Sequence, residues 1–446
     1  MTTTAHSVSA APATAASPAS APRPGLLSLD EAVARLLAVA SERVIGQTEE
    51  VPTLQALGRV LGEDVRSVLD VPPADNSSMD GYALRVADVP AAGTVLPVSQ
   101  RIPAGVVGGP LAPGSAARIF TGAQIPAGAD AVVMQEQCVP VGDPAVQSAG
   151  QSPVPSTSQL SVRVEAVPAS GQWIRRRGED IQVGATVLAR GALLTPQAMG
   201  LAASVGRAAL RVLRRPRVAL FSTGDELAMP GEPLKPGGIY NSNRFTLTGL
   251  LQASGCEVKD LGIVPDRLEA TREALRSAAQ GVDLILTSGG VSVGEEDHLK
   301  PAMQLEGRLD LWQVAMKPGK PLAFGAVRRA DGGEALFVGM PGNPVSSFVT
   351  FLLTVAPLLR ALQGRPAAAP VAYPLRADFD WPRPDRRREF LRVRLNDQGG
   401  LDLFPNQSSG VLTSTVWADG LVDVPAHQPI ARGEMVRFLP LHALLG

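Results

Sequence analysis

The stretch VDLILTSGGVSVGEEDHLK, Val282–Lys300, decides how the fold of this chain is read. Its first part is an apolar run of strand length that ends in two glycines, Gly289 and Gly290. Glycines let a backbone approach an anion closely, and Ser292 adds a hydroxyl that can bind the same anion. The acidic run that ends at Asp297 then opens a predicted helix, where it either supplies oxygen ligands to a cation or only complements the helix dipole.

Strands alternate with helices on both sides of this stretch. Asp266 and Glu269 have the spacing of a capping box at the start of one helix, and Asn343 with Pro344 begins another. Such alternation predicts a parallel sheet with helices on both faces, whose ligands bind beyond the carboxyl ends of the strands. The expected strands are RVALFS, CEVKDLGIV, VDLILTSGG and ALFVGM, and the expected helices are NRFTLTGLLQASG, DRLEATREALRSAAQG and PVSSFVTFLLTVAPLLRAL.

The flanks of this α/β region have a different pattern. A helix is predicted from Ser28, which has capping-box spacing with Glu31, and another from Thr195. Short apolar runs broken by Gly and Pro indicate β-rich structure from about Val51 to Arg190, and short alternating strands follow Pro370. The expected fold class is therefore α/β plus β in several domains. The expected divisions are 1–24 (a disordered tail), 25–195 (an elongated N-terminal part with a β-rich insertion), 196–368 (α/β) and 369–446 (a small β domain).

Composition excludes several classes of protein. The 446 residues are 45% hydrophobic and carry a formal net charge of −1, which argues against a general nucleic-acid binder. Cys138 and Cys256 are the only cysteines, so a disulfide framework is excluded. The four histidines lack zinc-site spacing, and a bound metal is therefore expected to be a hard ion such as Mg2+.

Two low-complexity segments and one apolar run bear on location. The first 24 residues contain one basic residue, Arg23, and no apolar core, so we expect a disordered tail rather than a transit peptide, and a cytoplasmic protein. Pro140–Gln159 is expected to form an exposed loop. The apolar run from Phe348 is interrupted by polar residues and is shorter than the ~20 residues of a membrane span, so a buried helix is expected.

Three further loops carry side chains suited to anions and cations. In STGDEL, Ser222–Leu227, the backbone and hydroxyls suit an anion and the carboxylates of Asp225 and Glu226 suit a metal, although the loop is also an ordinary polar turn. MKPGKPLAFG holds Lys317 and Lys320 in a loop stiffened by Pro and Gly, and a solvated lysine pair is its simpler interpretation. GMPGNPVSSF places Ser346 at a helix start. Together these loops predict one cleft for phosphate-like anions and a divalent cation.

The segment GVSVG also allows a different class of enzyme. It matches the nucleophile elbow of α/β-hydrolases, in which Ser292 would be the nucleophile. Such an enzyme needs a histidine base, which His427 or His442 would supply from the C-terminal region.

Four motifs occur in an order found in one family: DNSSMDGYA (Asp75–Ala83), GGVSVGEED, MKPGKP and GMPGNPVSSF. From about Leu27 to its end the chain resembles the molybdopterin molybdenumtransferase family, to which the E domain of gephyrin and its plant counterpart are similar. The resemblance implies a central molybdopterin-binding domain, a C-terminal β-barrel-like domain and a homodimer with a shared cleft. It also implies that adenylylated molybdopterin and molybdate are the substrates, that Mg2+ is the cofactor, and that AMP is released.

The resemblance also assigns residues. It implies that Glu226, Asp266 and Asp297 hold Mg2+ or support hydrolysis of the adenylate, although Asp266 is equally a helix cap. Asp80 and Thr121 are expected to enter the cleft as catalytic residues contributed by the partner subunit, although the MDGYA turn is equally a folding device. The residues expected to bind the substrates are Gly289, Gly290, Ser292, Lys317, Lys320, Pro321, Ser346, Arg392 and Ser409.

The sequence departs from the family pattern at two positions. Gln313 stands where relatives often have a lysine, and Asn241 where many have an acidic residue. Two other functions remain as alternatives: that of the molybdopterin adenylyltransferase and that of a non-enzymatic scaffold. The adenylyltransferase would lack the flanking domains, and it is instead a candidate partner. No nucleic acid and no membrane are expected as partners.

Overall fold

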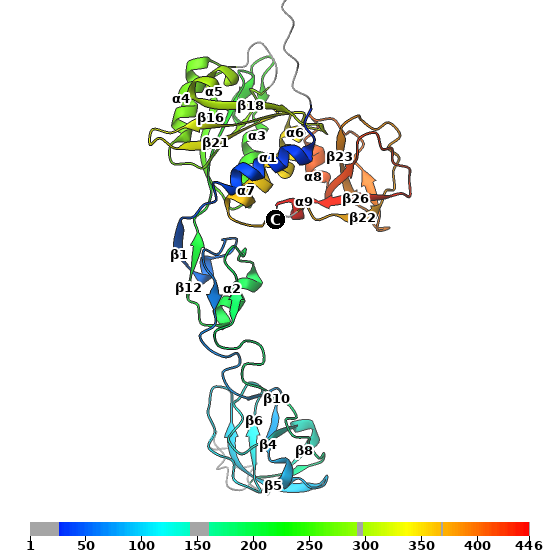
Figure 1. Cartoon of the computed structure of the whole chain (residues 1–446). Helices are drawn as coiled ribbons and strands as arrows, with labels where there is room; N and C mark the ends of the chain where they lie inside the picture. Colours follow the sequence, from blue (N-terminus) through cyan, green and yellow to red (C-terminus); the bar gives the residue numbers. More distant parts are fainter. Residues whose placement is uncertain (1–25, 143–159, 292–297, 367–368, 446) are drawn as a thin grey trace, which may run out of the picture. The chain divides into compact units, whose positions relative to one another are not determined.

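The computed structural model describes residues 26–142, 160–291, 298–366 and 369–445 (Figure 1). Contacts divide the chain into two compact units, one of residues 45–214 and one formed by the remaining N-terminal segment together with residues 215–446. Each unit is described by itself. The predicted tail 1–24 and residues 143–159 of the predicted loop Pro140–Gln159 lie outside the described residues.

The larger unit contains a central six-stranded sheet. Its order is β16 (Glu257–Val264), β13 (Arg217–Thr223), β17 (Leu284–Ser288), β21 (Glu334–Met340), β20 (Pro321–Arg328) and β18 (Gly307–Gln313). The first four strands are parallel, whereas β20 is antiparallel to β21 and β18 to β20. The parallel sheet predicted from the sequence is thus confirmed for four strands, and an antiparallel pair that the prediction missed extends its edge.

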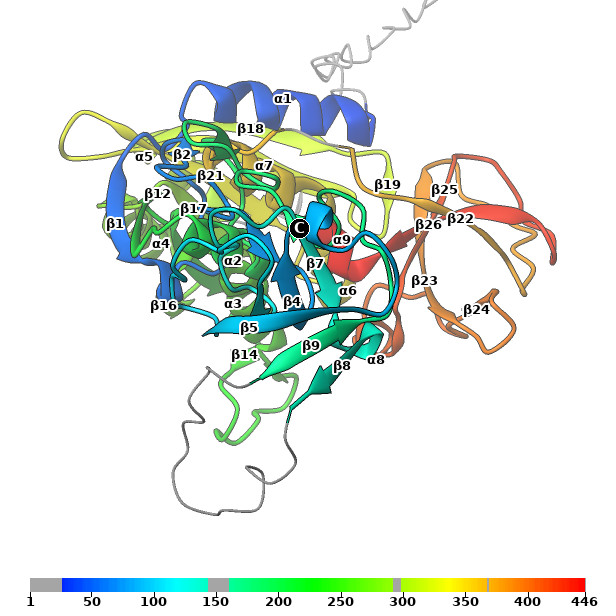
Figure 2. The same ribbon diagram turned by 90° about the horizontal axis from the view of Figure 1, so that it is seen from below.

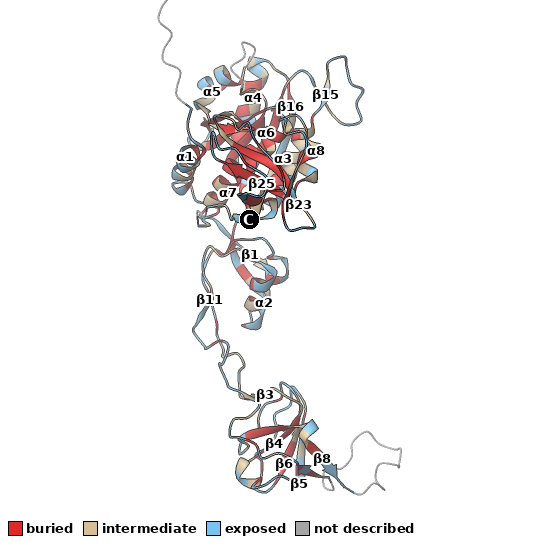
Figure 3. Ribbon diagram, turned by 90° about the vertical axis from the view of Figure 1, so that its right-hand side faces the viewer, coloured by how far each residue is buried: buried red, intermediate tan, exposed pale blue. Residues whose placement is uncertain are grey.

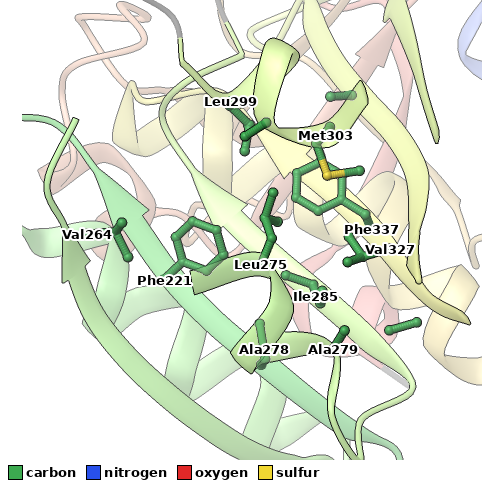
Figure 4. Packing of buried hydrophobic residues seen from close by; sticks show 14 of the residues in the cluster. Phe221, Val264, Leu275, Ala278, Ala279, Ile285, Leu299, Met303, Val327 and Phe337 are labelled. Atoms are coloured by element: carbon green, nitrogen blue, oxygen red, sulfur yellow. The ribbon is translucent and has the colours of Figure 1, made fainter. Parts of the chain in front are cut away.

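Two helices, α4 (Leu268–Ala279) and α5 (Leu299–Glu306), cover one face of this sheet (Figure 1). Phe221 and Phe337 from the strands pack there against Leu275 and Met303 from the helices (Figure 4). These side chains are fully buried, and each contributes about 1.5–3 kcal/mol by leaving water. Strands β13, β17 and β21 are buried along almost their whole length, whereas α4 and α5 also carry exposed residues (Figure 3).

The other helices of this unit include α3 (Ser242–Ala253), which contacts β13 and β16. The segments α6 (Pro344–Thr350), η6 (Phe351–Val355, a π-helical turn) and α7 (Ala356–Leu362) follow one another without a break. Helix α1 (Leu29–Ser41) packs along α7. The combined helix Pro344–Leu362 has 19 residues and a mean hydropathy of 1.8 in its most apolar window, which is long and apolar enough for a membrane span, but 83% of that window is buried within the protein. It coincides with the helix expected from the sequence, and its predicted burial is confirmed.

The first residues of α1 and α4 show whether the capping boxes predicted from the sequence are present. The predicted capping box is present at α1, where the Ser28 hydroxyl and the Glu31 carboxylate each accept a backbone N–H of the other residue. The capping box predicted for α4 is wrong, because this helix begins at Leu268 after Arg267 and has no side-chain cap. The Asp266 N–H, which a capping box would pair with the Glu269 side chain, donates instead to the Asp225 carboxylate at 3.3 Å.

A second sheet, in the same unit, contains the C-terminal strands (Figure 2). Its order is β19 (Met316–Lys317), β23 (Arg388–Leu395), β25 (Gly420–Val424), β26 (Met435–Pro440) and β22 (Tyr373–Arg376). Strand β24 (Leu401–Leu403) pairs with β23, and α8 (Thr413–Trp417) and α9 (Leu441–Leu445) are short helices. The predicted C-terminal β structure is confirmed, but one of its strands, β19, comes from the lysine loop far earlier in the chain.

The unit 45–214 is rich in strands, as predicted. Its main sheet has the order β7 (Ala131–Met134), β4 (Gly81–Leu84), β6 (Ala116–Ile119), β5 (Thr94–Ile102), β9 (Ser161–Val164) and β8 (Cys138–Val141). Strand β1 (Thr48–Pro52) pairs with β12 (Ala209–Leu213), and α2 (Pro196–Ser204) is capped by Thr195 as predicted. The other strand pairs are β2 (Val65–Arg66) with β11 (Thr186–Leu188) and β3 (Asn76–Ser77) with β10 (Ile174–Arg175).

Candidate active site

One large cavity lies in the larger unit, where loops that follow β13, β17 and β21 meet the lysine loop and a C-terminal segment. Its volume is about 1060 Å³. The predicted site residues that line it are Glu226, Gly289, Gly290, Lys317, Lys320, Pro321, Ser346 and Ser409. The structure thus brings together residues from four loops that the sequence singled out. Ser292 and Asp297, also predicted here, lie outside the described residues.

The glycine loop needs glycine at position 289. Gly289 has φ +90°, and a Cβ there would come within 2.7 Å of the Thr223 carbonyl oxygen on the neighbouring strand β13. The loop is fixed further by Asn243, whose amide donates to the Ser288 hydroxyl at 3.1 Å and to the Gly342 carbonyl at 2.7 Å. Asn243 also lines the cavity, and no sequence pattern pointed to it.

The lysine loop runs between the two sheets. It is closed by a hydrogen bond from the Val314 N–H to the Lys320 carbonyl at 2.8 Å. The Lys317 ammonium lies 3.0 Å from a Glu389 carboxylate oxygen and 3.5 Å from one of Asp385. Lys320 makes no ion pair within the described parts of the chain. The two lysines, which the sequence presents as equivalent, therefore differ, because only Lys317 has carboxylates beside it.

Two carboxylates at Lys317 are residues that the sequence analysis missed. Glu389 is 1% exposed although it stands in the apolar strand β23, and a buried acid in such a run is the signal that could have found it. Asp385 accepts three hydrogen bonds from Arg387, and these bonds, with the charge of Lys317, hold the pKa of its carboxyl well below the usual range. Arg387 lines the cavity.

Ser346 and Ser409 are placed by a contact between α6 and the C-terminal segment. Ser346 lies in the first turn of α6, and the adjacent Val345 N–H donates to the Ser409 carbonyl at 3.0 Å. Since anions are favoured at a helix N-terminus, this corner of the cavity suits an oxyanion.

Arg392 does not line the cavity as its predicted role required. Its side chain is 1% exposed and donates to the Ser414 hydroxyl and to the Phe390 and Ser408 carbonyls at 3.2–3.3 Å. Burial lowers the pKa of the guanidinium to about 10. Arg392 thus supports from beneath the segment that carries Ser408 and Ser409, and its predicted role at the oxyanion stays a prediction.

The predicted metal ligands are only partly assembled in the described residues. Glu226 is exposed on the loop after β13 and lines the cavity, and Asp225 beside it accepts the Asp266 N–H. Among residues 26–142, 160–291, 298–366 and 369–445, no three acidic, histidine or cysteine side chains form a cluster. Mg2+ is commonly held by one or two carboxylates together with substrate phosphates, so the carboxylates present fit this ion.

Asp80 and Thr121 meet in the other unit. The Asp80 carboxylate accepts the Thr121 N–H at 2.8 Å and its hydroxyl at 2.7 Å. These bonds, aided by the charge of Arg118, hold the pKa of Asp80 below its ordinary value. Arg118, which the sequence analysis missed, also lies over the rings of Tyr82 and Phe120. The structure thus places the two predicted residues in hydrogen-bonding contact within this unit.

The hydrolase alternative requires a histidine base at the cavity. Among the described histidines, none lines the cavity; His427 follows β25 and His442 lies in α9. The described residues of the cavity therefore do not favour this alternative.

Family comparisons cover most of the chain. Residues 27–206 match a model described as the MoeA N-terminal region (domain I and II), residues 219–361 a probable molybdopterin binding domain, and residues 374–441 the MoeA C-terminal region (domain IV).

Individual relatives agree with these matches. A molybdopterin molybdenumtransferase of Haemophilus influenzae is 36% identical over 427 residues, which cover 94% of this chain and 100% of the relative. Molybdopterin molybdenumtransferase 2 of Mycobacterium tuberculosis is 38% identical over 392 residues, covering 84% and 90%. The crystal structure of a molybdopterin biosynthesis moeA protein from Pyrococcus horikoshii OT3 aligns with a TM-score of 0.76 at 29% identity, covering 93% and 100%.

Proposed function

Because this chain belongs to the molybdopterin molybdenumtransferase family, we propose that it inserts molybdenum from molybdate into adenylylated molybdopterin and releases AMP. The observation that carries this proposal is the cavity of about 1060 Å³, in which glycine loops, serine hydroxyls and two lysines surround one space. Its size suits a nucleotide-sized ligand, since small-molecule pockets span about 300–1,000 Å³.

The oxyanion is bound by Lys317, Lys320 and the Ser346 hydroxyl. Charged hydrogen bonds to an oxyanion are roughly twice as strong as neutral ones, so the lysines provide affinity and the hydroxyl provides orientation. The glycine loop at Gly289 and Gly290 brings backbone close to the pterin phosphate. Ser292 extends this loop in the proposal, and Pro321 and Ser409 complete the pocket wall.

The adenylate is cleaved on the acidic side of the cavity. Glu226, Asp266 and Asp297 are proposed to hold Mg2+, which when bound neutralises phosphate charge and assists P–O cleavage. Glu226 and Asp225 present exposed carboxylates on one loop, and the Asp225–Asp266 hydrogen bond keeps the third acid close to it. Water attacks the adenylate, so that AMP leaves and the pterin keeps its terminal phosphate, while the dithiolene sulfurs of the substrate receive the molybdenum; neither step requires a protein nucleophile.

The finer biological setting is also proposed. The protein acts as a cytoplasmic homodimer, and Asp80 with Thr121 of a second copy completes the cleft. The ionised state of Asp80 supports this role, since a charged carboxylate is ready to orient water or a cation. The molybdopterin adenylyltransferase is the proposed source of the substrate.

The test is AMP release by the purified chain supplied with adenylylated molybdopterin, molybdate and Mg2+. We expect AMP only when molybdate is present, with molybdopterin retaining molybdenum. The same mixture without molybdate is the control. Absence of molybdate-dependent AMP would contradict the proposal, and labelling of Ser292 by a fluorophosphonate would favour the hydrolase instead.

A further inference from the structure

The ammonium of Lys317 lies beside two carboxylates, that of Glu389 in β23 and that of Asp385 shortly before this strand. Lys317 and Glu389 are register partners where β19 runs parallel to β23. Their charged atoms are 3.0 Å apart, and Asp385 approaches the same ammonium at 3.5 Å. The side chain of Lys317 is 41% exposed at the cavity, whereas that of Glu389 is 2% exposed behind it.

The Glu389 carboxylate has a fixed direction. One oxygen, Oε2, accepts the Trp381 indole N–H at 2.9 Å and the Asp385 backbone N–H at 2.7 Å. The other, Oε1, accepts no hydrogen bond within the described residues and lies 3.0 Å from the Lys317 ammonium as an ion pair. Because two donors anchor Oε2, the carboxylate is fixed with Oε1 beside the ammonium.

Charge in this cluster is balanced before any ligand binds. Lys317 and Arg387 are offset by Glu389 and Asp385, and Arg387 holds Asp385 with both Nε and Nη2 at 3.0 Å. An ammonium has three N–H donors, and the contact of Lys317 with Glu389 is an ion pair without a hydrogen bond. At least one donor of Lys317 is left for a ligand in the cavity.

We infer that Glu389, with Asp385, is a positioning residue that aims the Lys317 ammonium at the oxyanion. This inference rests on the proposed function, since the oxyanion is the molybdate substrate. A flexible lysine loses rotamer entropy on binding, and a buried carboxylate that fixes it beforehand removes that cost. Lys320, which has no such acid, provides net positive charge, whereas Lys317 provides an oriented donor.

A double-mutant cycle tests the inference. Glu389→Gln keeps the shape of the side chain and removes its charge, and Lys317→Met keeps the aliphatic stem and removes the ammonium. We expect each single change to raise the KM for molybdate about tenfold, or about 1.4 kcal/mol, with the KM for adenylylated molybdopterin unchanged. The double variant should be no worse than Lys317→Met, because Glu389 acts through Lys317. Additive losses, of about a hundredfold in the double variant, would overturn the inference.

Asp423→Asn is the matched control. Asp423 is an equally buried acid of the same sheet, paired with Arg388 at 2.6 and 2.7 Å, and it does not line the cavity. It should lower thermal stability and leave the KM for molybdate unchanged; an equal rise in KM would show that Glu389 acts only through general stability. If Glu389→Gln does not fold, Trp381→Phe removes one donor to Oε2 and should raise this KM about threefold. An unchanged KM in that variant would contradict the inference.

Failure of this inference is separable from failure of the proposed function. Equilibrium dialysis of the full chain with molybdate alone measures binding without turnover. A wild-type chain that binds molybdate but releases no AMP contradicts the function, and the cycle is then read from the dissociation constants. A wild-type chain that releases AMP while Glu389→Gln binds molybdate normally contradicts only the positioning role.

Discussion

Gly319 and Thr350 are in such close contact that a Cβ added at position 319 would overlap the threonine hydroxyl. Gly319 also has φ +104°, a backbone conformation that residues with a Cβ rarely adopt. The tip of the lysine loop is therefore seated directly on the helix that carries Ser346.

This contact predicts the effect of Gly319→Ala. The clash must push the loop away from the helix and displace both lysines, so we expect the KM for molybdate to rise at least tenfold, with a stability loss of about 1–3 kcal/mol. Gly332→Ala is the control, because Gly332 has φ +84° with open space around it. Both variants carry the backbone strain, and only the first carries the clash, so similar kinetics in the two would contradict the prediction.

Lys320→Ala should weaken molybdate binding by about ten- to a hundredfold, since a charged hydrogen bond contributes about 1.5–3 kcal/mol. Isothermal titration with molybdate measures the change. Lys259→Ala, which removes an exposed lysine bonded to the Ser277 carbonyl, should leave binding intact. Equal affinity of Lys320→Ala and the wild type would remove Lys320 from the anion site.

Arg392→Met should destabilise the protein even without ligand. The change removes three hydrogen bonds that a buried guanidinium donates while keeping apolar bulk, so a loss of about 2–4 kcal/mol is expected in urea unfolding. Arg392→Lys should not restore stability, because one ammonium does not reproduce the fork of the guanidinium. A variant as stable as the wild type, but unable to bind molybdate, would return Arg392 to the anion site.

The pKa of Asp80 should rise in Thr121→Val. The variant loses the hydroxyl bond and keeps the backbone N–H bond, so the pKa moves partway to its ordinary value, and Thr121→Ser should preserve the wild-type value. Carboxyl-13C NMR titration measures it. Since the folded pKa is depressed, these bonds stabilise the fold above the ordinary carboxyl pKa, and the stabilisation is lost as pH falls through the folded value. An unchanged pKa in Thr121→Val would assign the shift to other groups.

Local signals predicted local structure well. The Ser28–Glu31 capping box and the Thr195 cap depend on residues within one turn, and both are present. The same reasoning failed at Asp266, because a hydrogen bond to Asp225, from a different loop, competes with the cap. Tertiary contacts of this kind do not follow from spacing along the chain.

In the candidate site, too, local sequence signals could be predicted and tertiary contacts could not. Glycines, lysines and serines that follow apolar strands were found because parallel strands bring such loops to one edge. The acids at Lys317 could not be found, since they depend on the pairing of β19 with β23, whose partners Lys317 and Glu389 are far apart in sequence. Arg392 lies in the interior and does not line the cavity, and a pattern of residue types does not tell which of the two a strand side chain faces.

The two ends of the lysine loop belong to different sheets. Met316–Lys317 forms an edge strand of the C-terminal sheet, and Pro321 begins β20 of the central sheet. The span between the two ammonium groups is thereby tied to how these sheets are docked. A small displacement of one sheet relative to the other changes the distance between the two ammonium groups. The affinity for a small ion therefore depends on the interface between the two sheets as well as on the loop.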